Sequence, residues 1–495
     1  MTTETDPTQK IAWLPEFIYA GNRCQSNRAL VCDAAGAIVR IVEPSELNDE
    51  KRINLPRRAL LPGMVNAHSH AFQRVLRGRT EYRGSGQRDS FWTWRDKMYA
   101  AATQLSPEDI YDASCMTFLE MALTGITAVG EFHYLHHAPD GSAYEDPNLL
   151  AREVIRAAGD IGLRIALLRV AYARSGFQRP ANPSQARFIE ADADVYLKNV
   201  EELNRSVRSA SVRKGLANQR SARTRDPYGP AATAWAGVAP HSVRAVPLNY
   251  LKQVIDYAKE LDLKIHMHVA EQPAEVSACV EEYGRTPVAL LQTEGLLSER
   301  FTAVHAIHVT PKGIASFAQT GAAVCACPTT ERNLGDGVVP ADEYLKHGVT
   351  LSLGTDSHAQ IDLLEDAREL EYHLRLQRLE RAVLDDQSQD TSLNSQRLAA
   401  RLFECATVNG ARSIGAPTGA LEADTPADFF TVDLDDPSIA GGSPGDLLAS
   451  IVFASSRSAV REVVVGGKPI VSEGRHLNQE EIVARFNTLQ KKLWG

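Results

Sequence analysis

Two histidines separated by one residue close a short apolar stretch at 61–70, Leu-Pro-Gly-Met-Val-Asn-Ala-His-Ser-His. Alternate residues of a β-strand point to the same face, so His68 and His70 can approach one metal ion where the strand end opens into a cavity. A hydrolytic zinc site needs about three or four protein ligands and one position for water. The pair is therefore half of a site, and alone it fits two histidines at a polar strand end equally well.

A second strand-like stretch, Lys-Ile-His-Met-His-Val-Ala-Glu at 264–271, offers a third ligand. His266 and His268 share one strand face, and His268 lies nearer the C-terminal end, so we expect His268 to bind the metal and His266 to be a hydrogen-bonded neighbour. Glu271 follows where the strand passes into a loop. We expect it to carry protons at the metal site without binding the ion.

Two later apolar stretches also end in polar residues, His305 after 302–304 and Asp356 after 351–355. Asp356 is the expected fourth ligand, and it can also accept a proton from a metal-bound water. His305 is expected to stabilise charge that develops at the attacking oxygen. Together with Glu271, these residues form a predicted catalytic group.

The elements that must position these residues lie between about 61 and 410, where strand-like and helix-like stretches alternate. This alternation is typical of βα units, and eight such strands predict an α/β fold of the (β/α)8 TIM-barrel type with its active site at the C-terminal strand ends. The strands are expected at 63–68, 124–131, 164–170, 236–240, 264–269, 302–306, 322–326 and 350–356.

Both ends of the chain show short apolar runs separated by turn residues, which is typical of small antiparallel strands. At the C-terminal end these runs include 428–434, 451–453, 460–465 and 469–471, with Gly466-Gly467 as a turn. Neither set makes a sheet alone, so we expect one β-sandwich domain built from 1–60 and 412–495 beside a metal-dependent barrel at 61–411.

Composition limits the class of protein. The 495 residues carry a net charge of -9 with a pI near 5.9, which argues against a nucleic-acid-binding surface. There is no apolar run long enough to cross a membrane and no N-terminal export signal. The seven scattered cysteines suggest reduced thiols in the cytoplasm, with Cys325 and Cys327 in the core. The basic stretch 204–230 is interpreted as a solvated helix and loop, and 385–392 as a surface linker.

The order of the site residues along the chain resembles the amidohydrolase superfamily, in particular its mononuclear deaminases. No lysine that could be carboxylated ends the fourth predicted strand, which disfavours the binuclear branch. Longer motifs, spread over essentially the whole chain, resemble the formimidoylglutamate deiminase family. They are Asn-Ala-His-Ser-His-Ala-Phe-Gln-Arg at 66–74, Gly-Glu-Phe-His-Tyr at 130–134 and His-Val-Ala-Glu-Gln at 268–272, with 89–99, 237–246 and 327–336.

The resemblance implies hydrolysis of N-formimidoyl-L-glutamate to N-formyl-L-glutamate and ammonia in histidine degradation. It implies one divalent metal ion, Zn²⁺ or Fe²⁺, bound by His68, His70, His268 and Asp356. It also implies a small-molecule dicarboxylate as the partner, with its carboxylates held by the residues Arg95, Tyr134, His241 and Arg244 and its reacting end beside Gln73. We further expect a homodimer, the commonest default for a soluble enzyme.

The residue types support a dicarboxylate, because arginine presents a planar fork of donors that matches a carboxylate. A structural alternative for Arg95 is an ion pair inside an aromatic helix containing Phe91, Trp92 and Trp94. Two functional alternatives stay open: deamination of another amidine or a heterocycle such as guanine, and a catalytically silent metal-binding barrel.

Overall fold

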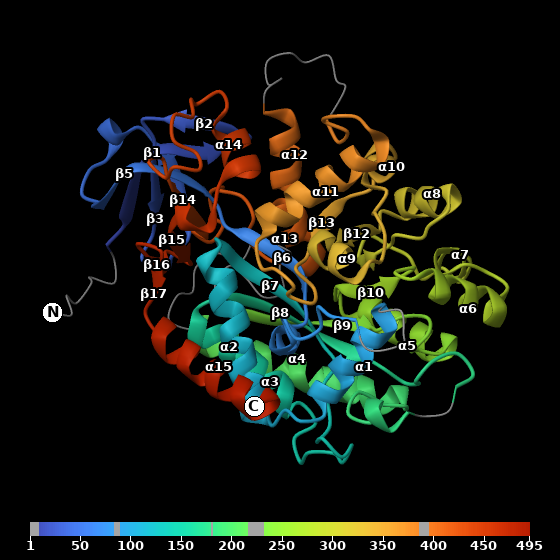
Figure 1. Ribbon diagram of the computed structural model, residues 1–495. Coiled ribbons are helices and arrows are strands. Elements are labelled where there is room, and N and C mark those ends of the chain that lie inside the picture. The colour runs from blue at the N-terminus through green and yellow to red at the C-terminus, as the bar shows by residue number, and fades with distance from the viewer. Residues whose placement is uncertain (1–8, 84–89, 180–181, 216–231, 386–395) are drawn as a thin grey trace.

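The computed structural model describes residues 9–83, 90–179, 182–215, 232–385 and 396–495, which fold into two sheets with surrounding helices (Figure 1). The barrel sheet has eight parallel strands in sequence order, and every predicted barrel strand is confirmed. These strands are β6 (Met64–Ser69), β7 (Ile126–His133), β8 (Arg164–Ala171), β9 (Ala234–Pro240), β10 (Ile265–Val269), β11 (Phe301–His305), β12 (Ala323–Ala326) and β13 (Leu351–Leu353).

Helices connect these strands and surround the barrel. Five of them begin with a proline, which lacks the N–H that a first helical turn leaves unpaired. The helices are α1 (Phe91–Ala102), α2 (Pro107–Leu123), α3 (Leu149–Ile161), α4 (Ala193–Gly215), α5 (Leu248–Glu260), α6 (Pro273–Tyr283), α7 (Pro287–Thr293), α8 (Pro311–Thr320), α9 (Pro328–Leu334), α10 (Ala341–Lys346), α11 (Leu363–Arg378), α12 (Arg397–Ala406) and α13 (Val408–Ile414).

The first and last barrel strands meet at the residues that the sequence marks for chemistry. The backbone N–H of Asp356 donates to the carbonyl oxygen of His68 (3.0 Å), and that of His70 donates to the carbonyl oxygen of Asp356 (3.1 Å). Gly354 lies so close to β6 that a Cβ there would be 2.9 Å from the His68 backbone oxygen. The closure of the barrel therefore places His68 and His70, at the end of β6, beside Asp356, which follows β13.

The second sheet, of nine strands, draws them from both chain ends, as the sequence predicts (Figure 1). Its order is β17 (Arg475–His476), β16 (Lys468–Ser472), β15 (Val460–Val465), β14 (Phe429–Asp433), β5 (Lys51–Pro62), β1 (Ile11–Ala20), β3 (Ala29–Cys32) and β4 (Ile38–Val42), with β2 (Arg23–Ser26) paired to β1. Most pairings are antiparallel, but β1 and β5 run parallel. β5 ends at Pro62, and Met64 opens β6, so one continuous segment joins this sheet to the barrel.

One predicted strand of the C-terminal part is wrong. Residues 451–453 belong to the helix α14 (Leu447–Ala454), not to a strand. A three-residue apolar run does not distinguish the two structures, because its periodicity is too short to measure. The last helix, α15 (Gln479–Trp494), lies along α2 on the outside of the barrel, so the C-terminal end of the chain packs on the barrel (Figure 1).

The predictions for the cysteines can be compared with the structure in full, and those for the basic stretch and the linker only in part. All seven cysteines are free, and Cys325 and Cys327 are fully buried. The basic stretch is helical up to Gly215, and its remainder lies outside the described residues, as do 386–392 of the predicted linker. Among the helices that are described, none combines the length and the apolar character needed to cross a bilayer.

A buried ion pair fixes the segment that follows β8. Arg169, at 0% exposure, donates to both carboxylate oxygens of Glu190, and Asn199 donates to the same group (2.7 Å). Burial raises the pKa of Glu190, but the charges of His136 and Arg169 outweigh burial and hold it at about 2. The carboxylate therefore stabilises the fold above its unfolded pKa of about 4.3, and this contribution is lost as the pH falls toward 2.

We expect Glu190→Gln to lower the free energy of unfolding by about 3 kcal/mol at pH 7, because it leaves Arg169 as an unpaired buried charge. The difference from the wild type should shrink as the pH is lowered from 5 to 3, where the wild-type carboxylate approaches protonation. Urea unfolding at several pH values measures both effects. A difference that is independent of pH would contradict the assigned role of this ion pair.

Candidate active site

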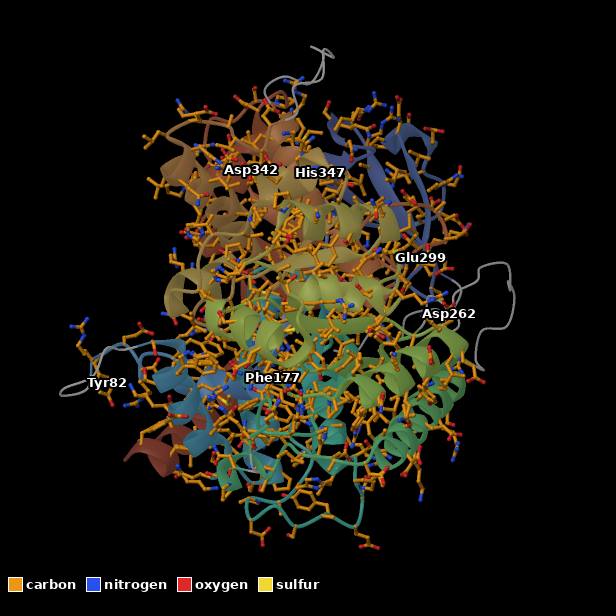
Figure 2. All side chains as sticks on the ribbon, turned by 90° about the vertical axis from the view of Figure 1, so that its right-hand side faces the viewer. Tyr82, Phe177, Asp262, Glu299, Asp342 and His347 are labelled. Carbon is orange, nitrogen blue, oxygen red and sulfur yellow. The ribbon has the colours of Figure 1, made fainter. Side chains whose placement is uncertain are left out.

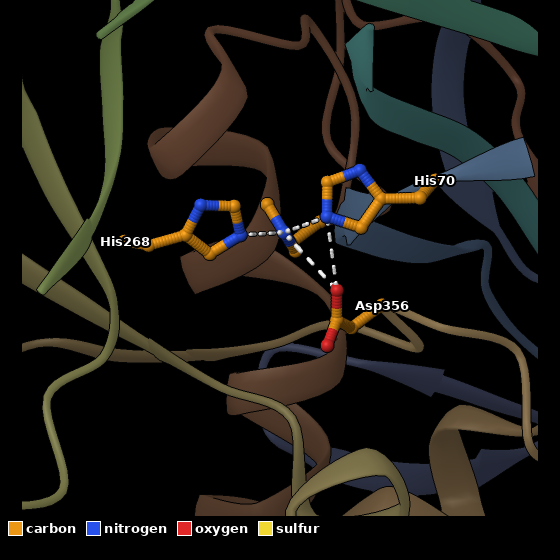
Figure 3. Close-up of side chains that lie close together, drawn as sticks. His70, His268 and Asp356 are labelled. Carbon is orange, nitrogen blue, oxygen red and sulfur yellow. Dashed lines mark hydrogen bonds and ion pairs between the residues drawn. The ribbon is translucent and has the colours of Figure 1, made fainter. Parts of the chain in front are cut away.

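Three imidazoles and one carboxylate converge at the C-terminal end of the barrel. The Nε2 atom of His68 lies 3.2 Å from Nε2 of His70 and 3.2 Å from Nε2 of His268, and Asp356 Oδ1 lies 3.1 Å from Nε2 of His70. Figure 3 shows His70, His268 and Asp356 turned toward one point. Their ligand atoms and that of His68 all lie within 4.8 Å of one another, and all four side chains are buried.

The hydrogen bonds of the rings leave the Nε2 lone pairs free to bind a metal ion. His70 Nδ1 lies 2.9 Å from the carbonyl oxygen of Phe132, and His268 Nδ1 lies 3.1 Å from that of His241. A carbonyl accepts, so each Nδ1 carries the hydrogen and each Nε2 keeps its lone pair. Burial lowers the pKa of His68 to about 3 and that of His268 well below its ordinary value, so both rings are neutral at pH 7.

This donor set fits a single divalent ion. The Nε2 lone pairs of His70 and His268 each lie 3.2 Å from Nε2 of His68 and repel unless a cation lies between them, and the Asp356 carboxylate supplies the matching negative charge. Imidazole with carboxylate suits zinc, and iron accepts the same ligands. The predicted set of His68, His70, His268 and Asp356 is therefore brought together, whereas His266 bonds through Nε2 to the carbonyl oxygen of Ser413 (3.0 Å), as expected for a neighbour.

The remaining predicted catalytic residues lie beside this group. His305 Nε2 is 3.6 Å from Glu271 Oε1 and 3.9 Å from Asp356 Oδ2. Burial raises the pKa of Glu271, which favours a carboxyl group able to hold a proton. Burial lowers the pKa of His305, but Glu271 and Glu331 outweigh it and place this pKa well above its ordinary value. The arrangement can accept, hold and return protons around one point.

The backbone is strained where it delivers these side chains. His305 has a φ of +67°, Asp356 of +43° and Ala270, just before Glu271, of +52°. Residues with a side chain rarely adopt this left-handed region, and the cost is about 1–3 kcal/mol each. The strain turns the chain sharply at the end of each strand, so that the side chain enters the barrel mouth.

A cavity of about 490 Å³, including its open mouth, extends from the metal-ligand group. Arg95 and Arg244 also line this cavity. No described carboxylate forms an ion pair with either one. The Nε and Nη1 atoms of Arg95 and Nη1 of Arg244 are shielded from solvent without a hydrogen-bond partner. Arg95 lies over the ring of Trp92 at 4.5 Å, and the described residues form no ion pair with it, so the ion pair considered from the sequence is not found there.

The other predicted substrate residues line the same cavity. Gln73 donates from Nε2 to the hydroxyl of Tyr134 (2.6 Å), and its Oε1 is buried without a partner. His241 lies at the mouth of β9, where burial and then Arg244 lower its pKa well below the ordinary value. The cavity thus combines metal ligands with two cationic forks and neutral donors.

The sequence profile of the amidohydrolase family matches residues 59–470. The chain belongs to the amidohydrolase family. Formimidoylglutamate deiminase of Pseudomonas aeruginosa is 37% identical over 431 residues, which cover 86% of this chain and 88% of that protein. A 5-methylthioadenosine/S-adenosylhomocysteine deaminase of Haloarcula marismortui is 26% identical over 447 residues, 90% of this chain and 88% of that protein.

Solved structures show the same family resemblance. An amidohydrolase from Brucella melitensis superposes with a TM-score of 0.84 at 31% identity, covering 98% of this chain and 100% of that one. An adenosine deaminase from Xanthomonas campestris, solved with bound zinc, has a TM-score of 0.79 at 22% identity and covers 98% of each chain, which shows the shared fold.

Two residues of this amidohydrolase site were not predicted from the sequence. Glu331, at the start of α9, lies 3.2 Å from Nδ1 of His305 and orients that ring. Glu131 accepts from Ser69 Oγ (2.6 Å) and from the backbone N–H of Ala71 (2.7 Å), which holds the end of β6. Both glutamates stand inside motifs quoted for the family resemblance, but their partners are 26 and 62 positions away along the chain. These two pairs become visible only in the folded structure, because the sequence does not indicate which distant residues meet.

Metal content tests the ligand set of this amidohydrolase. We expect about one divalent ion per purified wild-type chain, and we expect His268→Ala to weaken metal affinity by about 100-fold or more, because one of four ligands is lost. His266→Gln, which keeps a donor for Ser413, is the matched control and should retain the metal. Elemental analysis after dialysis against a metal buffer measures both. Equal metal content in His268→Ala and the wild type would remove His268 from the ligand set.

Proposed function

We propose that this protein hydrolyses N-formimidoyl-L-glutamate to N-formyl-L-glutamate and ammonia. One observation carries the proposal: Arg95 and Arg244 line the same cavity as a group of metal ligands, and the described residues form no ion pair with either arginine. Two unpaired guanidinium groups in a partly closed site are costly unless a ligand supplies negative charge. A dicarboxylate with a reactive amidine supplies that charge and places the amidine toward the metal ligands. The Pseudomonas relative, by its name, acts on such a compound.

The chemistry follows from the positions of the side chains. A divalent ion held by His68, His70, His268 and Asp356, which we propose to be zinc, would supply a water whose pKa lies near neutrality. Asp356 takes a proton from the attacking water. Glu271 gives a proton to the imine nitrogen and shuttles protons until the carbon–nitrogen bond breaks and ammonia leaves.

His305 completes this group, because its Nε2 lies between Glu271 and Asp356, where an attacking oxygen would pass. A donor at this position stabilises the negative charge that develops there during attack. Gln73, with its free Oε1, is placed to accept a hydrogen bond from the formimidoyl group. Tyr134 fixes the orientation of that amide through its hydroxyl.

A neutral heterocycle such as guanine fits the metal ligands but not the arginines of the cavity. It would form an ion pair with neither guanidinium group, and the buried nitrogen atoms of Arg95 and Arg244 would stay unbonded. The structure therefore favours the dicarboxylate over the ring. A metal-binding barrel without activity has no use for a cation pair aimed into the cavity.

Ammonia release tests the proposal directly. Zinc-loaded protein is assayed with N-formimidoyl-L-glutamate, with N-formimidoyl-L-aspartate and guanine in parallel. We expect rapid release from the glutamate compound and little from guanine. Turnover of a heterocycle with an inert glutamate compound would reject the dicarboxylate pocket while leaving the metal site intact. Bound metal without turnover of any amidine would favour the silent barrel.

A further inference from the structure

Two tyrosines that line the cavity with Arg95 and Arg244 accept hydrogen bonds from the same side-chain amide. Gln185, at 1% exposure, donates from Nε2 to the hydroxyl oxygen of Tyr99 (2.7 Å) and to that of Tyr172 (2.6 Å). Both tyrosines line the cavity together with Arg95 and Arg244. Gln185 itself does not line the cavity, so it acts on a ligand only through the two rings.

This arrangement decides which way the hydroxyl hydrogens point. An amide nitrogen has two hydrogens, and here each is directed at one tyrosine oxygen, so both oxygens accept. The two hydroxyls lie 3.4 Å apart, and only one of them can donate to the other. At least one hydroxyl hydrogen is thus left to be donated elsewhere, and the neighbouring space is the cavity.

The segment that carries Gln185 is anchored on both sides. Arg187 donates to the carbonyl oxygens of Ala102, at the end of α1, and of His137 (2.9 Å). The ring of Phe188 packs against those of Tyr99 and Tyr172, with centroids 5.4 and 6.0 Å apart. These contacts hold the Gln185 amide in one place relative to the cavity wall.

A neighbouring part of the same segment reaches the surface. Figure 2 shows Phe177 near the middle of the face that it views and Tyr82 at the edge of that face. The Phe177 ring packs on Tyr283 (6.0 Å), and Arg174 lies over it at 5.1 Å while donating to the carbonyl oxygen of Arg244 (3.0 Å). Phe177 is therefore connected through Arg174 to Arg244 in the wall of the cavity.

We propose that Gln185 is a positioning residue that sets the hydroxyls of Tyr99 and Tyr172 as donors toward a substrate carboxylate. The proposal rests on the proposed function for the identity of that carboxylate. It adds two neutral donors to the cationic forks of Arg95 and Arg244. A carboxylate has about four acceptor positions, so forks and hydroxyls can bind it together.

Two substitutions separate donation from packing. Gln185→Glu keeps the shape but presents acceptors, which reverses the tyrosine hydroxyls and adds a negative charge beside the carboxylate. We expect it to raise KM for N-formimidoyl-L-glutamate by at least about tenfold with kcat within about threefold of the wild type. Gln185→Met removes the hydrogen bonds without reversing them, and its KM should rise by about three- to tenfold. Inhibition by glutarate, which carries two carboxylates and no amidine, should weaken in parallel.

A double-mutant cycle tests whether Gln185 acts through the tyrosines. In a Tyr99→Phe/Tyr172→Phe background, Gln185→Met should change KM by less than about twofold, because the hydroxyls that it positions are gone. Gln253→Glu, at an exposed site on α5, is the matched control and should leave KM and glutarate inhibition unchanged.

The outcomes distinguish this inference from the proposed function. Unchanged KM and glutarate inhibition in Gln185→Glu overturn the inference, as does a fall in kcat and melting temperature with no change in KM. A full effect of Gln185→Met in the tyrosine-free background also overturns it. If the wild type binds glutarate but hydrolyses no formimidoylglutamate, the proposed function fails. Weaker glutarate binding by Gln185→Glu would then still support the positioning role.

Discussion

Glu271→Gln is expected to lower kcat by about 100-fold or more while the chain keeps its metal ion. Glutamine preserves the shape of the side chain but cannot take up and return a proton. Glu271 lies 3.6 Å from His305 and is absent from the group of four converging ligand atoms. Proton transfer should therefore be lost without loss of metal.

Steady-state kinetics on N-formimidoyl-L-glutamate, combined with elemental analysis, measures both parts of this result. Glu281→Gln, an exposed position on α6, makes the same chemical change outside the cavity and should leave kcat unchanged. Near-normal turnover in Glu271→Gln would remove this residue from proton transfer. Loss of the metal together with activity would instead make Glu271 part of the metal site.

Replacing either cavity arginine should act on substrate binding. We expect Arg95→Met and Arg244→Met each to raise KM for N-formimidoyl-L-glutamate by about 100-fold or more, because a charge-assisted fork to a carboxylate is lost. Arg244→Lys keeps the charge without the fork and should recover only part of the affinity. The effect on kcat should be smaller, since the carboxylates do not react.

The same substitutions should not destabilise the free protein. Each guanidinium lines the cavity without a described ion-pair partner, so its removal breaks no ion pair. We expect melting temperatures equal to or above that of the wild type in the absence of substrate. Arg332→Met, at an exposed arginine paired with Glu369, is the control and should leave KM unchanged. Unchanged KM in both cavity variants would reject the dicarboxylate pocket.

The barrel and its metal ligands could be predicted from the sequence for a physical reason. Parallel strands place their C-terminal ends at one mouth, and the twofold repeat of a strand decides which residues face inward. His68, His70 and His268 satisfy both conditions, and so does Asp356 at the last strand end. The same short-range rules fail at 451–453, where an apolar triplet is compatible with helix or strand and tertiary packing selects the helix α14.

The roles of the surrounding residues depend on pairs that are distant along the chain. Gln185 meets Tyr99 across 86 positions and Glu131 meets Ser69 across 62, and neither pair has a local pattern. The arginines could be chosen from the chemistry of a dicarboxylate, but only the folded chain shows that buried nitrogen atoms of Arg95 and Arg244 lack hydrogen-bond partners. Local periodicity thus determined which side chains reach the barrel mouth. Long-range packing decided their partners, because a hydrogen bond or an uncompensated charge exists only once distant segments meet.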